Sequence, residues 1–186
     1  MALKSKPFSE QVALVTGGGT GIGRAFAGAL ASAGARVVIA SRNEATLQST
    51  ADELNSAAGA ERVFAYAFDV RDRGQCEAVV RHCVERFGAL DVLVNNSGLA
   101  VPETVEEITE EGWDKVLETN LKGAMRLVRA ALPVMAAQEF GEARLRRRSV
   151  LLRLEVGPAR LRRVSARPRA QIGREHPCLQ LLPRPR

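Results

Sequence analysis

A glycine-rich segment near the N-terminus has the residue types that a phosphate-binding turn needs. It reads Thr16-Gly-Gly-Gly-Thr-Gly-Ile-Gly23 and lies between an apolar run and a helical pattern. Gly17 allows a sharp exit from a strand, Gly21 lets backbone approach a phosphate, and Gly23 permits close packing of helix on strand. Because free N–H groups at a helix start attract anions, the segment predicts a turn that binds the pyrophosphate of a dinucleotide.

The residues after the second apolar run bear on which dinucleotide is bound. An acidic side chain at this place accepts hydrogen bonds from a free ribose 2′-hydroxyl and repels a 2′-phosphate. The sequence has Ser41 and Arg42 here and no acid until Glu44. A guanidinium offers a fork of donors suited to phosphate, so we predict NADP(H) in preference to NAD(H). The alternative is that Arg42 is only an exposed cation at the start of a helix.

The elements that must position these residues alternate along the chain as far as residue 138. Short apolar runs, which we expect to be buried strands, cover residues 11–16, 36–40, 62–68 and 91–95. Helical patterns cover residues 22–33, 43–57, 72–87 and 109–138. Such alternation indicates βαβ units, whose strand ends meet at one ligand-binding edge. The predicted fold is α/β, a Rossmann-type doubly wound parallel sheet that is incomplete, with strands one to four present and later strands missing.

Four ordered motifs resemble those of the short-chain dehydrogenase/reductase family. They are the turn at Thr16–Gly23, the pair Asp69-Val70, the segment Asn95-Asn96-Ser97-Gly98 and the segment Leu117-Glu-Thr-Asn-Leu-Lys-Gly123, which contains Asn120. Family members most often have alanine where this sequence has Ser97. The resemblance covers roughly residues 8–140.

The resemblance implies an NADP(H)-dependent oxidoreductase that transfers hydride between a carbonyl and an alcohol of a small-molecule substrate. The cofactor-binding residues that it implies are Thr16, Gly17, Thr20, Gly21, Ile22, Gly23, Ser41, Arg42, Asp69, Val70, Asn96 and Gly98. Asp69 and Val70 would contact the adenine, and Asn120 would support a proton-relay water. Three alternatives stay open: Asp69 caps the following helix, Asn96 is a structural turn residue, or Asn120 is a solvated helix residue.

The catalytic pair of this family is missing from the sequence. Family members use a tyrosine as general acid/base and a lysine four residues later, whose ammonium favours the phenolate. The sequence has Tyr66 as its one tyrosine, far upstream of the expected place, and Lys122 as its last lysine. Ser149 falls near the place of the family's substrate-orienting serine, although a single serine at a loose spacing also arises by chance. We therefore expect this form to be inactive.

The C-terminal segment differs in charge from the rest. Residues 1–140 hold 14 Lys+Arg and 18 Asp+Glu, whereas residues 141–186 hold 13 Arg and 3 Glu. We interpret residues 1–140 as a partial NAD(P)-binding domain and residues 141–186 as an Arg/Pro-rich segment that we expect to be disordered. The leading hypothesis is a reading frame shifted after about Gly141, since GC-rich codons read out of frame yield Arg and Pro. The alternative, a basic arm that binds nucleic acid, is disfavoured because the segment has no aromatic residue for stacking.

Composition bears on the remaining classes of function. No apolar run approaches the roughly 20 residues of a membrane span, and the start has no apolar secretion signal. The three cysteines lack metal-ligand spacing, so we expect no metal site and reduced thiols in a cytoplasmic protein. The helical pattern at 109–138 is similar to one with which family members form homo-oligomers. We therefore expect exposed apolar surface on it and poor solubility.

Overall fold

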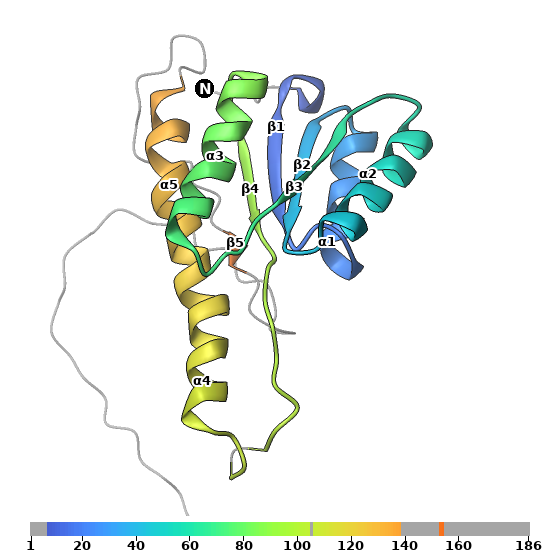
Figure 1. The fold of residues 1–186 in the computed structure, drawn as a ribbon. Helices are drawn as coiled ribbons and strands as arrows, with labels where there is room; N and C mark the ends of the chain where they lie inside the picture. The colour runs from blue at the N-terminus through green and yellow to red at the C-terminus, as the bar shows by residue number, and fades with distance from the viewer. Residues whose placement is uncertain (1–6, 105, 139–152, 155–186) are drawn as a thin grey trace, which may run out of the picture.

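The computed structural model describes residues 7–104, 106–138 and 153–154. Strands and helices alternate through most of this part of the chain (Figure 1). The strands are β1 (Val12–Thr16), β2 (Arg36–Ser41), β3 (Val63–Ala67), β4 (Val92–Asn95) and a short β5 (Arg153–Leu154). The helices are α1 (Gly21–Ser32), α2 (Glu44–Ala58), α3 (Arg73–Phe87), α4 (Glu110–Leu117) and α5 (Ala124–Ala137). A 3-10 turn, η1 (Phe8–Glu10), precedes β1, and a π-helical segment, η2 (Glu118–Gly123), lies between α4 and α5.

All described strands are parallel, in the order β3-β2-β1-β4-β5. The predicted Rossmann-type sheet is therefore confirmed. β5 is an addition to the prediction: its two residues pair with Val94 and Asn95 of β4, within the Arg-rich segment that we expected to be disordered. β5 thus covers the outer edge of β4 over these two residues.

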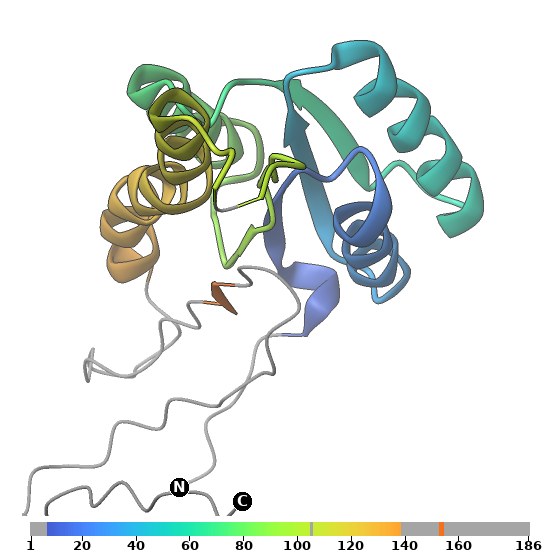
Figure 2. The same ribbon diagram turned by 90° about the horizontal axis from the view of Figure 1, so that it is seen from below.

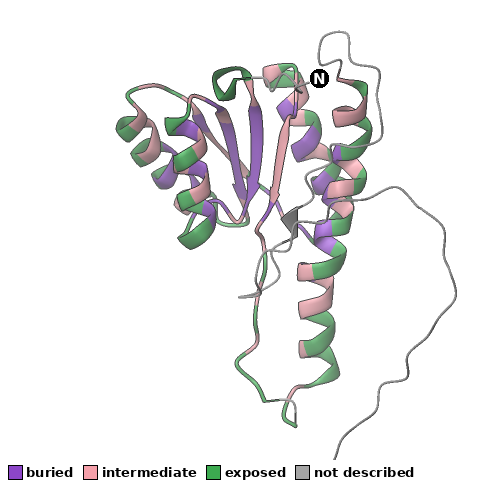
Figure 3. Ribbon diagram, turned by 180° about the vertical axis from the view of Figure 1, so that it is seen from behind, coloured by how far each residue is buried: buried purple, intermediate pink, exposed green. Residues whose placement is uncertain are grey.

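The strands are apolar on both sides because helices cover both faces of the sheet. Seen along the strands, α1 and α2 lie on one face and α3 and α5 on the other (Figure 2). Successive β1 residues alternate between the two cores: Val12 and Leu14 pack towards α3 and α5, and Ala13 and Val15 towards α1 and α2. β1 and most of β2 are fully buried in the centre of the sheet (Figure 3).

Two helices begin at side-chain caps that fix where the loops at the sheet edge end. The Asn43 Oδ1 accepts a hydrogen bond from Thr46 N (3.0 Å), and the Asp72 Oδ1 accepts one from Gln75 N (3.0 Å). Asn43 is therefore the N-cap of α2. The cap of α3 is Asp72, so the alternative that Asp69 serves only as a helix cap is wrong.

The helix expected over residues 109–138 is not one regular helix. It consists of α4, the π-helical η2 and α5, and α4 has no buried residue (Figure 3). A π turn has wider spacing than the period of 3.6 that predicted the helix, and such turns are frequent at functional sites. Apolar side chains on this stretch are exposed as expected, namely Trp113, Leu121, Met125 and Leu132. No helix in the described part of the chain is long and apolar enough to cross a membrane.

Candidate functional site

The glycine-rich turn leaves β1 and enters α1 in a conformation that glycine favours. Gly17 and Gly21 have φ values of +63° and +52°. A Cβ at Gly23 would lie 2.2 Å from the carbonyl oxygen of Gly17, so only glycine fits there. A Cβ at Gly21, by contrast, would meet no described atom within 4 Å. The backbone at Gly21 is therefore open to an approaching group, next to the N-terminus of α1.

The turn is fixed to the end of β4 by hydrogen bonds in both directions. Thr16 Oγ1 accepts hydrogen bonds from the backbone N–H groups of Asn96 and Ser97, each at 3.0 Å. Asn96 Nδ2 donates to the carbonyl oxygens of Thr16 (3.0 Å) and Gly17 (3.2 Å). Asn96 is thus a structural turn residue here, and this role places it beside the glycine-rich turn.

The loops after β2 and β3 meet at the same edge of the sheet. The carbonyl oxygen of Ser41 accepts a hydrogen bond from Phe68 N (2.8 Å), which brings Arg42 and Asp69 into one neighbourhood. The pKa of the Asp69 carboxyl lies below its usual value, mainly because the Arg71 side chain donates hydrogen bonds to it. Burial acts in the opposite direction, and the positive charge of Arg42 adds to the lowering. A carboxylate and two guanidinium groups therefore share this edge.

Asn120 lies in η2 and is bonded to the loop that follows β4. Its side-chain Oδ1 accepts from Leu99 N (2.8 Å), and its Nδ2 donates to the Leu99 carbonyl oxygen (2.9 Å). The alternative that Asn120 is merely a solvated helix residue is therefore wrong. At the end of η2, a Cβ on Gly123 would lie 2.7 Å from Cγ2 of Val70. The segment η2 thus touches both the loop after β4 and the loop after β3.

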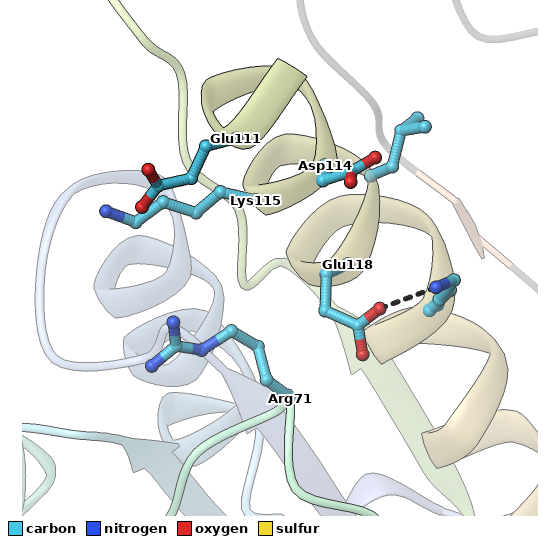
Figure 4. A pocket seen from close by; sticks show the side chains of 7 residues that line it. Arg71, Glu111, Asp114, Lys115 and Glu118 are labelled. Atoms are coloured by element: carbon cyan, nitrogen blue, oxygen red, sulfur yellow. Dashed lines mark ion pairs between the residues drawn. The ribbon is translucent and has the colours of Figure 1, made fainter. Parts of the chain in front are cut away.

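A charged hollow of about 510 Å³ lies between the loop after β3 and the α4–η2 stretch (Figure 4). Its lining residues are Arg71, Glu111, Asp114, Lys115, Leu117, Glu118 and Lys122. Glu118 pairs with Lys122 at 2.8 Å and also with Arg126. No residue of the glycine-rich turn lines this hollow, so it is not the place of the predicted pyrophosphate.

The predicted site residues thus gather around the carboxyl ends of β1 to β4. Ser149 lies outside the described residues. Tyr66 lies within β3, with its ring 4.8 Å from the ring of His82 on α3. Sequence reasoning missed Arg71 and Gly123, although Gly123 stood in the quoted Asn120 motif and Arg71 stands two residues after Asp69. No group of three potential metal-ligating side chains occurs among the described residues.

Known proteins resemble this chain in sequence and in structure. A family model described as short chain dehydrogenase matches residues 11–143. Galactitol 2-dehydrogenase of Agrobacterium fabrum is 39% identical over 133 residues, which are 72% of this chain and 50% of that protein. The chain spans about half the length of the curated relatives it matches.

Two solved structures share the same arrangement of strands and helices. One is L-sorbose reductase from Gluconobacter frateurii, complexed with NADPH and L-sorbose. It is 37% identical, with a TM-score of 0.64, and the likeness covers 68% of this chain and 48% of that chain. An NADPH-bound short chain oxidoreductase from Pseudomonas aeruginosa PAO1, described as containing an atypical catalytic center, is 36% identical with a TM-score of 0.66. That likeness covers 70% of this chain and 51% of the other.

Proposed function

Because the chain belongs to the short chain dehydrogenase family, we propose that it binds NADP(H) at the carboxyl edge of its sheet. The observation that carries the proposal is the turn between β1 and α1. Its backbone is held by Thr16 and Asn96, and it is open at Gly21 beside a helix N-terminus. N–H groups in such a place suit a pyrophosphate.

In this proposal each loop holds one part of the cofactor. The turn residues Thr16, Gly17, Thr20, Gly21, Ile22 and Gly23 hold the pyrophosphate, and Asn96 and Gly98 complete the cradle from β4. At the adenine, the ionised Asp69 carboxylate accepts and the neighbouring Val70 N–H, which has no partner among the described residues, donates. Adenine offers the matching amino donor and ring-nitrogen acceptor.

The preference for NADP(H) rests on Ser41 and Arg42, which stand where an acid would repel a 2′-phosphate. NADPH in the two solved relatives is in keeping with this. Arg42→Met should weaken NADPH binding at least about tenfold, as expected for a lost guanidinium–phosphate pair, and leave NADH binding unchanged. Arg81→Met, on the exposed face of α3, is the control for the loss of charge. Equal or stronger binding of NADH by the unaltered protein would remove the proposed preference.

The family reaction is hydride transfer between a carbonyl and an alcohol, and the nicotinamide supplies the hydride when it is bound. We propose that this 186-residue form does not perform it, because the sequence has no Tyr-x-x-x-Lys pair to move the proton. It is then a cofactor-binding protein without turnover. Robust oxidation of NADPH with any of a panel of ketones would contradict this, whereas fluorescence enhancement of NADPH without turnover supports it.

The binding proposal is tested with two glycines of similar geometry. Gly21 and Gly59 both have positive φ, and a Cβ at either would meet nothing within 4 Å. Gly59 ends α2, outside the proposed site. Alanine at either position costs similar backbone strain, about 1 kcal/mol. NADPH fluorescence titration should show binding lost in Gly21→Ala and kept in Gly59→Ala; equal affinity in both variants would refute the site.

The remaining parts of the proposal concern the whole protein. We propose a cytoplasmic location, supported by the buried free thiols of Cys76 and Cys83. We also propose homo-oligomers that form through the exposed apolar side chains of α4 to α5.

We also keep the hypothesis that the reading frame shifts after about Gly141, since the family match ends at residue 143. Sequencing the DNA across codons 135–186 tests it: neighbouring frames without Tyr-x-x-x-Lys would exclude it. Steeply salt-dependent DNA binding would instead support the basic arm.

A further inference from the structure

We propose that Arg71 orients the Asp69 carboxylate so that the site accepts adenine and rejects a 6-oxopurine, which makes Arg71 a specificity-determining residue. This inference rests on the proposed binding of NADP(H). It assigns a role to a side chain outside the motifs that indicated the site.

The geometry around Asp69 is specific. Its Oδ1 accepts from the backbone N–H of Arg71 at 2.9 Å. The Arg71 Nε lies 3.1 Å from both carboxylate oxygens, and Nη2 lies 2.6 Å from Oδ2. A carboxylate has about four acceptor sites, and these three N–H groups fill about three of them. One acceptor site therefore remains, and its direction is fixed by Arg71.

Arg71 is bonded to Asp69 and lines the same hollow as Glu118. From the loop after β3 it extends beneath α4, with Lys115 and Glu111 projecting above it (Figure 4). The pKa of the Arg71 guanidinium is raised, mainly by its side-chain hydrogen bonds to Asp69 and then by the negative charges of Asp69 and Glu118. The charged groups that act on Asp69 are Arg71 and, after β2, Arg42. The charge of Asp69 acts in turn on the Cys76 thiol of α3, which burial keeps neutral.

This arrangement selects the base by its donors and acceptors. An ionised carboxylate only accepts, and the adjacent Val70 N–H only donates. Adenine presents an amino donor and a ring-nitrogen acceptor and fits both groups. Hypoxanthine presents a carbonyl acceptor and a ring N–H donor and opposes both. Without Arg71 the carboxylate is free to rotate or to take up a proton, and a protonated carboxyl can donate to the carbonyl of hypoxanthine.

The experiment compares Arg71→Met with Arg73→Met in the full chain. Arg73 is a matched control because it is exposed, lies two residues away and pairs with Glu77 instead of Asp69. Calorimetry gives the affinity for NADP⁺ and for its 6-oxo (deamino) analogue. For R71M we expect about fivefold weaker NADP⁺ binding and at least about a threefold loss of discrimination between the two ligands, in the range of partly exposed ion pairs. R73M should match the unaltered protein in both measurements.

A pH profile separates this role from a merely structural one. Arg71 holds the pKa of Asp69 below its usual value, so the unaltered protein keeps the binding-competent carboxylate to lower pH. In R71M the acid-side loss of NADP⁺ affinity should therefore begin at higher pH, and R73M should overlay the unaltered protein. R71K keeps the positive charge but not the paired N–H donors of the guanidinium. It should therefore keep the affinity for NADP⁺ at low pH and still lose discrimination between the two ligands. This second variant keeps the inference testable if R71M does not fold.

The outcomes distinguish this inference from the proposed function. If the unaltered protein does not bind NADP⁺, the proposed function fails, and this inference fails with it. If the unaltered protein binds NADP⁺, and R71M shows the same ratio of affinities for NADP⁺ and its 6-oxo analogue and the same pH profile, only the role of Arg71 is refuted. Tighter NADP⁺ binding by R71M would also refute it, since Arg71 would then compete with the base.

Discussion

Replacing Thr16 with valine tests whether the turn is held by the hydroxyl at the end of β1. Thr16 is completely buried, and its Oγ1 accepts two backbone N–H groups at 3.0 Å. Valine has nearly the same shape, so the change removes the acceptor without opening a cavity. Each N–H left without a partner costs about 1–3 kcal/mol. Since both lie in a partly buried region, we expect a loss of about 2–4 kcal/mol in the free energy of unfolding.

Urea denaturation followed by far-UV circular dichroism measures this loss. Thr20→Val is the matched control, because Thr20 is exposed and its side chain makes no capping hydrogen bond at the start of α1. That variant should stay within about 0.5 kcal/mol of the unaltered protein. T16V should also bind NADPH more weakly, since the backbone N–H groups of Asn96 and Ser97 lose their acceptor. A T16V protein as stable as T20V would refute the role assigned to the hydroxyl.

Three further predictions concern packing, thiol chemistry and turnover. Gly123→Ala should lower both stability and NADPH affinity, because its Cβ would press on Val70 at 2.7 Å; overpacking costs about 1–3 kcal/mol. Burial raises the pKa of Cys76 to about 11 and of Cys83 to about 12, so at pH 8 neither thiol should react with Ellman's reagent until the protein unfolds. Tyr66→Phe should leave any residual NADPH oxidation unchanged, and a lost rate would reveal Tyr66 as a proton donor.

The pattern of apolar residues predicted most of the fold for a physical reason. Buried parallel strands need continuous apolar runs, and helices that cover them need an apolar stripe, so both signals are local. The helical pattern at 43–57 begins at the N-cap residue of α2, because a cap acts within one turn of its helix. The run at 11–16 and the strand β1 differ by a single residue, since strand ends depend on pairing with β2 and β4.

The parts that escaped prediction depend on contacts between distant segments. Periodicity does not separate the π turn at Glu118–Gly123 from regular helix, because the apolar stripe continues through it. The pairing of Asn120 with Leu99 joins segments 21 residues apart. Thr16 and Asn96 are 80 residues apart, and only the parallel pairing of β1 with β4 makes them neighbours. The motifs therefore indicated candidate site residues, and the structure was needed to find the residues that these candidates contact.

These contacts make the proposed cofactor site independent of the segment in which the family's catalytic pair would lie. Thr16 and Asn96 join β1 to β4, Phe68 and Ser41 join β3 to β2, and Asn120 joins η2 to the loop after β4. All of these bonds form within residues 16–120. A site held in its binding geometry before the ligand arrives loses little conformational freedom on binding. Under the proposed function, binding and turnover are therefore separable: the hydrogen bonds that join these loops lie before residue 141, and the sequence has no Tyr-x-x-x-Lys pair to move the proton.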